Sequence, residues 1–217
     1  MGRTPPVTRS RRSYDQYCAA ARALDAVGDR WTLLIVRELL VGPRRYTDLH
    51  ADLPGVSTDV LASRLKDMER EGLTTRRRLP PPSAAYVYEL TERGRALLPV
   101  LQALATWGAP ALQERAPTDA VRAHWFALPL LRGLAGLGAE GVVEVCLDEG
   151  AFHLRVGGGA ESCGDGPSLA APDVRLVLDS ETCVEVSRGA LTVGEGVRAG
   201  RIELSGDGVL AKVLRES

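Results

Sequence analysis

Long apolar runs, paired cysteines and lysine are scarce in this chain of 217 residues, and each shortage narrows what the protein can be. No window is apolar over the length that a membrane-spanning helix needs, and no apolar run of signal-peptide length follows the N-terminal arginines. The 4 cysteines lie far apart, with neither a CxxC spacing nor the density of a disulfide scaffold. We therefore expect a protein that stays in a reducing cytoplasm and does not enter a membrane.

Patterns that carry catalysis or metal binding are also missing. The 3 histidines, His50, His124 and His153, are expected in three different elements, without an HExxH motif or paired carboxylates. The segment 136–141 fits GxGxxG, but it follows an expected helix and precedes an expected strand, the reverse of the order in a dinucleotide-binding fold. We therefore predict no catalytic residue, no metal, no cofactor and no enzymatic activity.

Charge is divided unevenly along the chain. Residues 1–100 hold 17 Arg and Lys against 12 Asp and Glu, whereas residues 101–217 hold 10 against 16, so the two parts carry +5 and −6. Only Lys66 and Lys212 are lysine, which we attribute to codon usage in a GC-rich genome. The charge difference indicates two domains, of which the first faces polyanions.

The stretch 44–94 carries the most specific pattern: a short helix, a turn, an amphipathic helix and two strands joined by a stiff proline tip. In the amphipathic helix Leu61, Leu65 and Met68 share one face, and Ser57 stands at the N-cap position. This order predicts a winged helix-turn-helix, a module that places one helix in a DNA groove. The expected elements are helices over 14–27, 31–40, 46–51 and 57–71, a turn over 53–56, strands over 73–79 and 85–90, the tip at 80–84 and a helix that opens at Thr91.

The helix after Thr91 has too many apolar residues for one narrow stripe, and such a helix usually packs on two sides. We therefore expect a homodimer. The apolar residues of this helix are Leu97, Leu98, Leu101, Leu104, Ala105 and Trp107.

Candidate DNA contacts fall at the start of the helix-turn-helix, on the exposed face of the amphipathic helix and in the arginine triplet of the hairpin. Because side chains alternate along a strand, Arg76 and Arg78 should share a face that Arg77 does not. Arg64 flanks the apolar stripe and could instead pair with an acidic neighbour such as Glu71. The predicted DNA-binding residues are Arg44, Arg45, Tyr46, Ser57, Thr58, Asp59, Ser63, Arg64, Lys66, Arg76, Arg77 and Arg78.

Beyond a boundary at 116–119, helical and strand patterns alternate irregularly, which predicts an α+β module. An apolar helix is expected first, and a hairpin follows it. The expected elements are helices over 121–137, 180–187 and 208–214, and strands over 142–147, 151–156, 174–178 and 201–204.

Several separated blocks in the first half resemble the HxlR-type family of bacterial regulators. The resemblance implies a homodimeric winged-helix repressor or activator. Asp59 departs from the family pattern; it repels phosphate but can accept a hydrogen bond from cytosine, so the operator cannot be inherited. The family also makes Cys18 a redox candidate, although a buried structural role is favoured because Arg22 is the only cation nearby. The matching blocks are 18–24, 29–39, 42–46, 53–57, 64–65 and 88–94.

The second half, above all residues 184–214, resembles a sterol carrier protein 2-type domain. The resemblance implies a curved sheet covered by helices around an apolar cavity, and a cavity on a regulator implies a small apolar effector. The large apolar candidates for its lining, each of which also suits an ordinary core, are Trp125, Phe126, Leu130 and Phe152.

These observations predict an α+β chain with a disordered basic arm (1–13), a winged helix-turn-helix domain for DNA binding and dimerisation (14–115) and a sterol carrier protein 2-like ligand-binding domain (120–217). The predicted function is that of a sequence-specific transcriptional regulator whose partners are double-stranded DNA, a second copy and a small apolar effector. Three alternatives stay open: a hydrophobic-ligand carrier whose first half only dimerises, an enzyme acting on an apolar compound, and a regulator whose second half binds protein.

Overall fold

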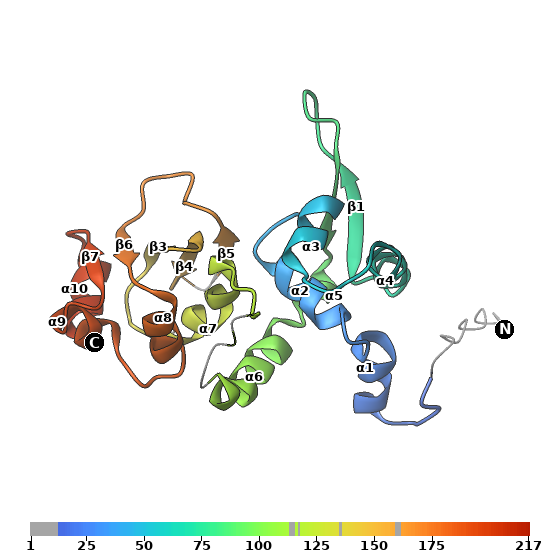
Figure 1. Cartoon of the computed structure of the whole chain (residues 1–217), viewed down its shortest axis with the longest axis horizontal. Helices are drawn as coiled ribbons and strands as arrows, with labels where there is room; N and C mark the ends of the chain where they lie inside the picture. Colours follow the sequence, from blue (N-terminus) through green and yellow to red (C-terminus); the bar gives the residue numbers. More distant parts are fainter. Residues whose placement is uncertain (1–12, 113–115, 117, 135, 159–161) are drawn as a thin grey trace.

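A computed structural model describes residues 13–112, 116, 118–134, 136–158 and 162–217. They form two modules side by side, an N-terminal one with a tall hairpin and a C-terminal one built on a five-stranded sheet (Figure 1). Each module has its own hydrophobic core. The expected basic arm lies outside the described residues, apart from Ser13, whose hydroxyl donates to Asp25 at 3.1 Å.

The N-terminal module follows the expected order of elements, except that the first helix begins at Ala19 rather than at residue 14 and that two helices replace the one expected after Thr91. Its second helix is central because Ile35 and Val36 are 0% exposed, and it ends before Gly42, whose φ of +132° suits glycine. The elements are α1 (Ala19–Val27), α2 (Thr32–Leu40), α3 (Tyr46–Asp52), α4 (Thr58–Arg70), β1 (Thr74–Arg78), β2 (Tyr86–Leu90), α5 (Glu92–Arg95), α6 (Leu98–Gly108) and a 3-10 turn η1 (Ala109–Ala111).

The helix-turn-helix consists of α3 and α4. The turn between them passes through Gly55 at φ +84°, a backbone conformation that residues with a Cβ rarely adopt. α4 begins after Ser57, whose hydroxyl accepts a hydrogen bond from the Val60 N–H at 3.3 Å, as the N-cap prediction required. Since Leu61 and Leu65 on its apolar stripe are at most 1% exposed, the opposite face points to solvent.

β1 and β2 form the predicted wing. The strands pair antiparallel with Arg76 opposite Tyr88, and the hairpin rises well clear of both modules (Figure 1). Thr91 fixes its base, because its hydroxyl donates to the Gly72 carbonyl at 2.6 Å and accepts from the Gly94 N–H at 3.1 Å. The wing therefore projects from a firmly attached base.

The single helix expected after Thr91 is two helices, α5 and α6. Pro99 lies in the first turn of α6, where its missing N–H costs nothing, so a new helix starts there. Leu101 of α6 is buried, whereas Val100, Leu104 and Trp107 are 43%, 44% and 84% exposed. In the single chain, one apolar face of α6 is therefore exposed to solvent.

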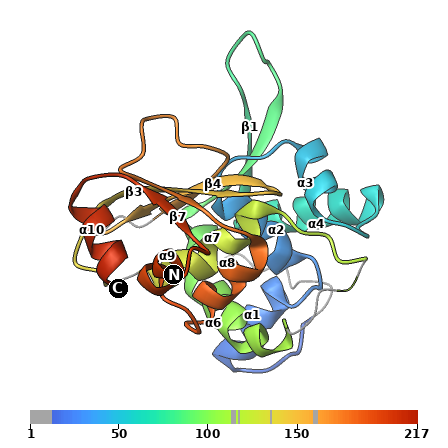
Figure 2. The same cartoon turned by 60° about the vertical axis from the view of Figure 1, so that its left-hand side comes forward.

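The C-terminal module is a mixed sheet in the order β5-β4-β3-β6-β7. β3 and β4 form the expected hairpin, β6 joins β3 in parallel, and α7 and α8 lie against one face of the sheet (Figure 2). The elements are η2 (Ala123–Phe126), α7 (Ala127–Gly133), β3 (Gly141–Leu147), β4 (Gly150–Val156), β5 (Ser162–Asp165), β6 (Val174–Val177), α8 (Ser180–Ser187), α9 (Val193–Arg198), β7 (Glu203–Ser205) and α10 (Val209–Glu216).

Three details of this module differ from the sequence prediction. The expected helix over 121–137 is a 3-10 turn followed by the shorter α7. β5 was not predicted because Ser162–Asp165 lacks β-branched and aromatic residues, and only pairing with β4 makes it a strand. α9 was not predicted because Val193–Arg198 contains two glycines, which disfavour helix.

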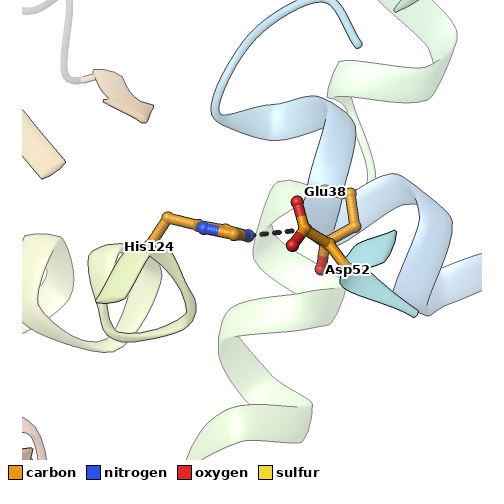
Figure 3. Close-up of side chains that lie close together, drawn as sticks. All are labelled: Glu38, Asp52 and His124. Carbon is orange, nitrogen blue, oxygen red and sulfur yellow. Dashed lines mark hydrogen bonds and ion pairs between the residues drawn. The ribbon is translucent and has the colours of Figure 1, made fainter. Parts of the chain in front are cut away.

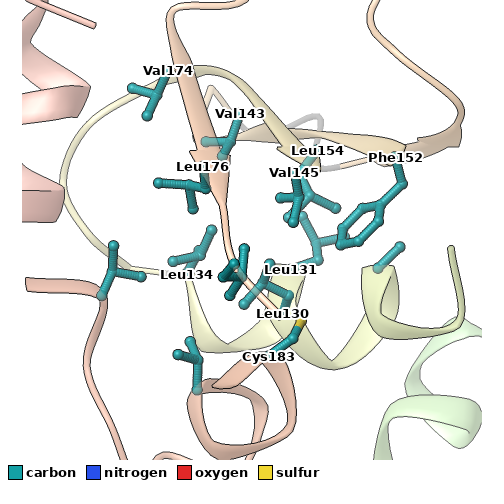
Figure 4. Packing of buried hydrophobic residues seen from close by; sticks show 14 of the residues in the cluster. Leu130, Leu131, Leu134, Val143, Val145, Phe152, Leu154, Val174, Leu176 and Cys183 are labelled. Atoms are coloured by element: carbon teal, nitrogen blue, oxygen red, sulfur yellow. The ribbon is translucent and has the colours of Figure 1, made fainter. Parts of the chain in front are cut away.

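The core of the C-terminal module lies between the sheet and its helices (Figure 4). Phe152 and Leu154 of β4 and Val143 of β3 are 0% exposed and face Leu130 and its neighbours on α7. The module is mixed α+β as predicted, but its resemblance to a sterol carrier protein 2-type domain stays a prediction. Among the described residues, no helix has both the length and the apolar character needed to span a membrane.

Candidate nucleic-acid interface

The exposed face of α4 is free for contact with a partner. Asp59, Ser63 and Lys66 are all exposed, and they lie on the side away from the buried stripe. Ser57 and Thr58 are exposed at the N-terminus, where free N–H groups favour phosphate oxygens. An α-helix with such a face fits the width of a DNA major groove.

The three arginines of β1 have different neighbours. The Arg76 guanidinium lies 4.0 Å from the centre of the Tyr86 ring and 6.0 Å from that of Tyr88, so the rings hold it on one face of the wing. Arg77 on the other face pairs with Glu89 at 3.2 Å. Arg78 Nε donates to the Ala84 carbonyl at 3.4 Å, at the neck of the tip.

Two residues at the start of the helix-turn-helix, Arg45 and Tyr46, have different roles. Arg45 is exposed and reaches the wing, where its Nη2 donates to the Ser83 hydroxyl at 3.1 Å. Tyr46 is half-buried, and its hydroxyl donates to the Thr58 carbonyl at 2.8 Å. Tyr46 therefore ties α3 to the first turn of α4, while Arg45 brings a cation between α4 and the wing.

Two of the predicted DNA-binding arginines are engaged elsewhere, and we remove them from the interface. Arg44, with a side chain 11% exposed, lies 3.5 Å from Asp52 and 3.0 Å from Asp165 of the other module. Arg64 pairs with Asp29 at 2.9 Å and with Asp67 at 3.2 Å, so it does pair with acidic groups, but not with Glu71. A partly buried ion pair would have to break before either guanidinium reached phosphate.

Cys18 differs from the expected buried thiol, since it is exposed at the N-cap position of α1. The backbone N–H groups of Ala21 and Ala20 lower the pKa of its thiol, because they favour the thiolate. Burial raises the pKa of Cys163 to about 11 and that of Cys183 to about 12. Its N-cap position and its exposure therefore both make the thiol of Cys18 more acidic than those of Cys163 and Cys183.

The four candidates for a ligand-binding cavity lie in two different places. Phe152 and Leu130 are 0% and 1% exposed within the C-terminal core, and Phe126 packs at its edge. Trp125 instead lies at the junction of the modules, where its indole N–H donates to Glu38 at 2.9 Å and Arg37 covers its ring at 4.3 Å. The structure therefore does not bring these four residues together around one site.

Sequence reasoning missed a polar cluster between the modules. Glu38 on α2 is 0% exposed, and its carboxylate meets the His124 ring 2.6 Å away, in the position shown in Figure 3. Arg122 donates to Asp52 at 2.9 Å, next to a polar groove of about 270 Å³ that Asp165 also lines. The partners are 70 or more positions apart in the sequence, so no local spacing could have indicated them.

Together, the exposed helix, its N-cap and the arginine-bearing hairpin define a winged helix-turn-helix protein. The model of the HxlR-like helix-turn-helix family matches residues 26–116. YvaP of Bacillus subtilis, an HTH-type transcriptional regulator, is 40% identical over 86 residues, which make up 40% of this chain and 80% of that protein. The chain belongs to the HxlR-like helix-turn-helix family.

A second relative, the HTH-type transcriptional regulator YodB of Bacillus subtilis, is 36% identical over 85 residues, or 39% of this chain and 76% of that protein. The solved structure of reduced YodB is 32% identical and covers 48% of this chain and 100% of that one, with a TM-score of 0.40. These relatives are regulators rather than enzymes, and the N-terminal module is accordingly a DNA-binding regulator domain. The stretch that matches YvaP fills most of that protein but less than half of this chain.

Proposed function

We propose that this protein is a homodimeric, sequence-specific transcriptional regulator in which α4 enters the major groove and the wing contacts the flanking backbone. The observation that carries the proposal is the exposed polar face of α4 beside a hairpin whose Arg76 and Arg78 are exposed. Groove contacts from Asp59, Ser63 and Lys66 would supply sequence preference, while the wing and Arg45 would supply affinity for phosphate.

A second copy is needed to bury the apolar face of α6. Leu104 and Trp107 of that helix, and Leu24 of α1, are 44%, 84% and 50% exposed. Large exposed apolar residues of this kind favour a protein interface. Two copies related by a twofold axis would place two α4 helices in successive major grooves, about one helical turn of DNA apart.

The C-terminal module would act as the sensor of a small apolar effector. Support comes from the contact between the modules, because Asp52 of α3 and Glu38 of α2 both bond to residues of the C-terminal half. A ligand acts only through different affinities for two states, so the effector would have to favour one placement of this module. Titration of apolar compounds, followed by thermal shift and by DNA affinity in the same samples, tests this role. Ligand binding without any DNA retention would instead indicate a hydrophobic-ligand carrier.

The direct test of DNA reading is selection of bound fragments from genomic DNA, followed by substitution on α4. Ser63→Ala or Lys66→Ala should change which sequences are selected, because removing a base contact costs about 1–3 kcal/mol at that base pair only. Glu216→Ala on α10, far from the interface, is the control and should leave the selected sequence unchanged. Uniform weakening without a change of preference would contradict the assignment of this face to base reading.

A further inference from the structure

His124 is enclosed by carboxylates that belong to both modules. Its Nε2 lies 2.6 Å from Glu38 Oε2 on α2, and its Nδ1 lies 3.3 Å from Asp165 Oδ1 on β5 (Figure 3 shows the Glu38 side). The imidazole is 5% exposed and Glu38 is 0% exposed. The ring sits in η2, immediately after the linker between the modules, so its contacts join the linker to both.

Several charged groups surround the ring and its carboxylate partners. α2 supplies Arg37, 2.6 Å from Glu38 Oε1, and the segment before α3 supplies Arg44, 3.0 Å from Asp165. From α3 comes Asp52, held by Arg44 and by Arg122 of the linker, and from the β3–β4 turn comes Glu149 on the wall of the adjoining groove. We call Glu38, Asp52, His124, Asp165 and the three arginines the interdomain cluster.

The geometry requires a charged imidazole. An ionised carboxylate only accepts hydrogen bonds, so a ring with a carboxylate at each nitrogen must donate from both, which only imidazolium does. Burial lowers the pKa of His124, but the hydrogen bonds to Asp165 and Glu38 outweigh it, and the pKa lies above its ordinary value. The hydrogen bond with His124 also lowers the pKa of Asp165, so its carboxylate stays charged.

A proton suits this position better than a metal ion. The Glu38, Asp52 and His124 donor atoms lie within 4.8 Å of one another, but Glu38 is already bonded to Arg37 and the Trp125 indole. Asp52 is bonded to Arg122 and Arg44. A divalent cation would therefore have to displace these guanidinium and indole partners from the carboxylates.

We propose that protonated His124 fastens the C-terminal module to α2 and α3, and that loss of this proton as pH rises loosens the contact between the modules. Deprotonation leaves one carboxylate facing a lone pair in a buried site, and that arrangement is costly. The rest of the contact is the Asp165 N–H bond to the Val41 carbonyl at 3.2 Å, the packing of Val41, Leu128 and Cys163 against the core of the other module, and the contact between α6 and α7.

The first test is NMR titration of the imidazole resonances in the full chain. Only 3 histidines are present, so His124→Gln assigns the signal by its disappearance. The expected result is that His124 remains protonated above the ordinary histidine pKa of about 6.5. A His124 imidazole that loses its proton at or below that ordinary value would overturn the proposal even if the variant failed to fold.

The second test is amide exchange at Asp165, whose N–H bond crosses between the modules. In His124→Gln the protection at Asp165 should fall on the order of tenfold or more at pH 7, while strand β3 stays protected. His50→Gln is the matched control, because that ring stacks on Tyr46 instead of meeting carboxylates. Unchanged protection at Asp165 in a folded His124→Gln variant would refute the role of the proton.

An effect on DNA affinity would follow only if the proposed function is correct. α3 is the first helix of the helix-turn-helix and α2 packs against it, so loosening the contact should change DNA affinity several-fold as pH rises in the native chain and not in His124→Gln. The titration and exchange tests need no DNA. Failure of DNA binding alone would therefore refute the proposed function but not the protonated contact. Failure of both earlier tests would refute the protonated contact but not the proposed function.

Discussion

At the scale of single residues, the neighbours of each arginine decide whether it is free for DNA. Arg44 and Arg64 have carboxylates within 3.5 Å and little exposed surface, so their charges are already used. Arg76 is held by aromatic rings, which leave its guanidinium edge and its charge available. A charge count along the sequence treats all of these residues alike, although only some can neutralise phosphate.

Arg76→Ala combined with Arg78→Ala should weaken binding to every DNA sequence. The slope of log affinity against log salt should become shallower by roughly 0.9 for each phosphate that the wing no longer neutralises, because fewer counterions are released. Fluorescence anisotropy over a salt series measures this slope. Arg77→Ala is the control, and a smaller effect is expected because Arg77 is paired with Glu89. An unchanged slope in the double variant would remove the wing from the interface.

Cys18 should be the first thiol to react with iodoacetamide in the folded protein. It is exposed and backbone N–H groups lower the pKa of its thiol, whereas burial raises the pKa of Cys163 to about 11. Peptide mapping by mass spectrometry after a short pulse measures the order of alkylation, and urea-unfolded protein gives the reference rates. Equal labelling of Cys163 and Cys18 in the folded state would show that the exposure argument is wrong.

At the scale of elements, α6 shows how one helix serves two purposes. Leu101 faces the N-terminal core, while Leu104 and Trp107 face solvent in the single chain. The break at Pro99 separates this helix from α5, so α6 is free to leave the winged module and pack against α7. A helix with apolar residues on more than one side was foreseen from the sequence, but its separate start was not.

Leu104→Glu together with Trp107→Glu should convert dimers into monomers, because a dimer would bury two carboxylates per copy in an apolar contact. Sedimentation velocity at micromolar concentration measures the change. Val209→Glu on α10 is the matched control, since that residue is 72% exposed and lies at the opposite end of the molecule from the wing module (Figure 1). If the native chain sediments as a monomer, the proposed dimer is excluded.

At the scale of the whole molecule, two apolar cores meet across a polar contact. Val41 of the N-terminal module packs into the C-terminal core, and Leu128 of the C-terminal module packs into the N-terminal core. Ion pairs around His124 and the contact between α6 and α7 also join the modules. A contact of this kind costs little to open compared with a core, so the placement of the modules can respond to conditions.

Stability should consequently depend on pH through His124. A folded-state pKa above the unfolded value of about 6.5 adds stability that is fully present below that pH and is lost as pH rises through the folded pKa. The native chain should therefore lose its advantage in melting temperature over His124→Gln as pH increases above neutrality. Scanning calorimetry of both proteins over that range measures the difference, and a difference that grows with pH would contradict the sign.

Short-range signals in the chain were enough to define the winged module. The apolar spacing around Leu61, the cap at Ser57 and the glycine turn are all local, and they predicted α3, α4 and the wing nearly to the residue. In the C-terminal half the hairpin β3–β4 and α8 were predicted for the same reason. β5 and α9 were not, since their stability comes from neighbours rather than from their own residues.

The use of the charged groups, in contrast, depends on contacts that form only in the folded chain. Glu38 and His124 are 86 positions apart, and nothing in either local sequence reveals that they meet. Whether Arg44 and Arg64 are paired likewise depends on which carboxylates the fold places beside them. Whether Cys18 is exposed depends on how the chain packs around it. Secondary structure is set by interactions over a few residues, whereas the state of an ionisable group is set by everything within a few ångströms in space.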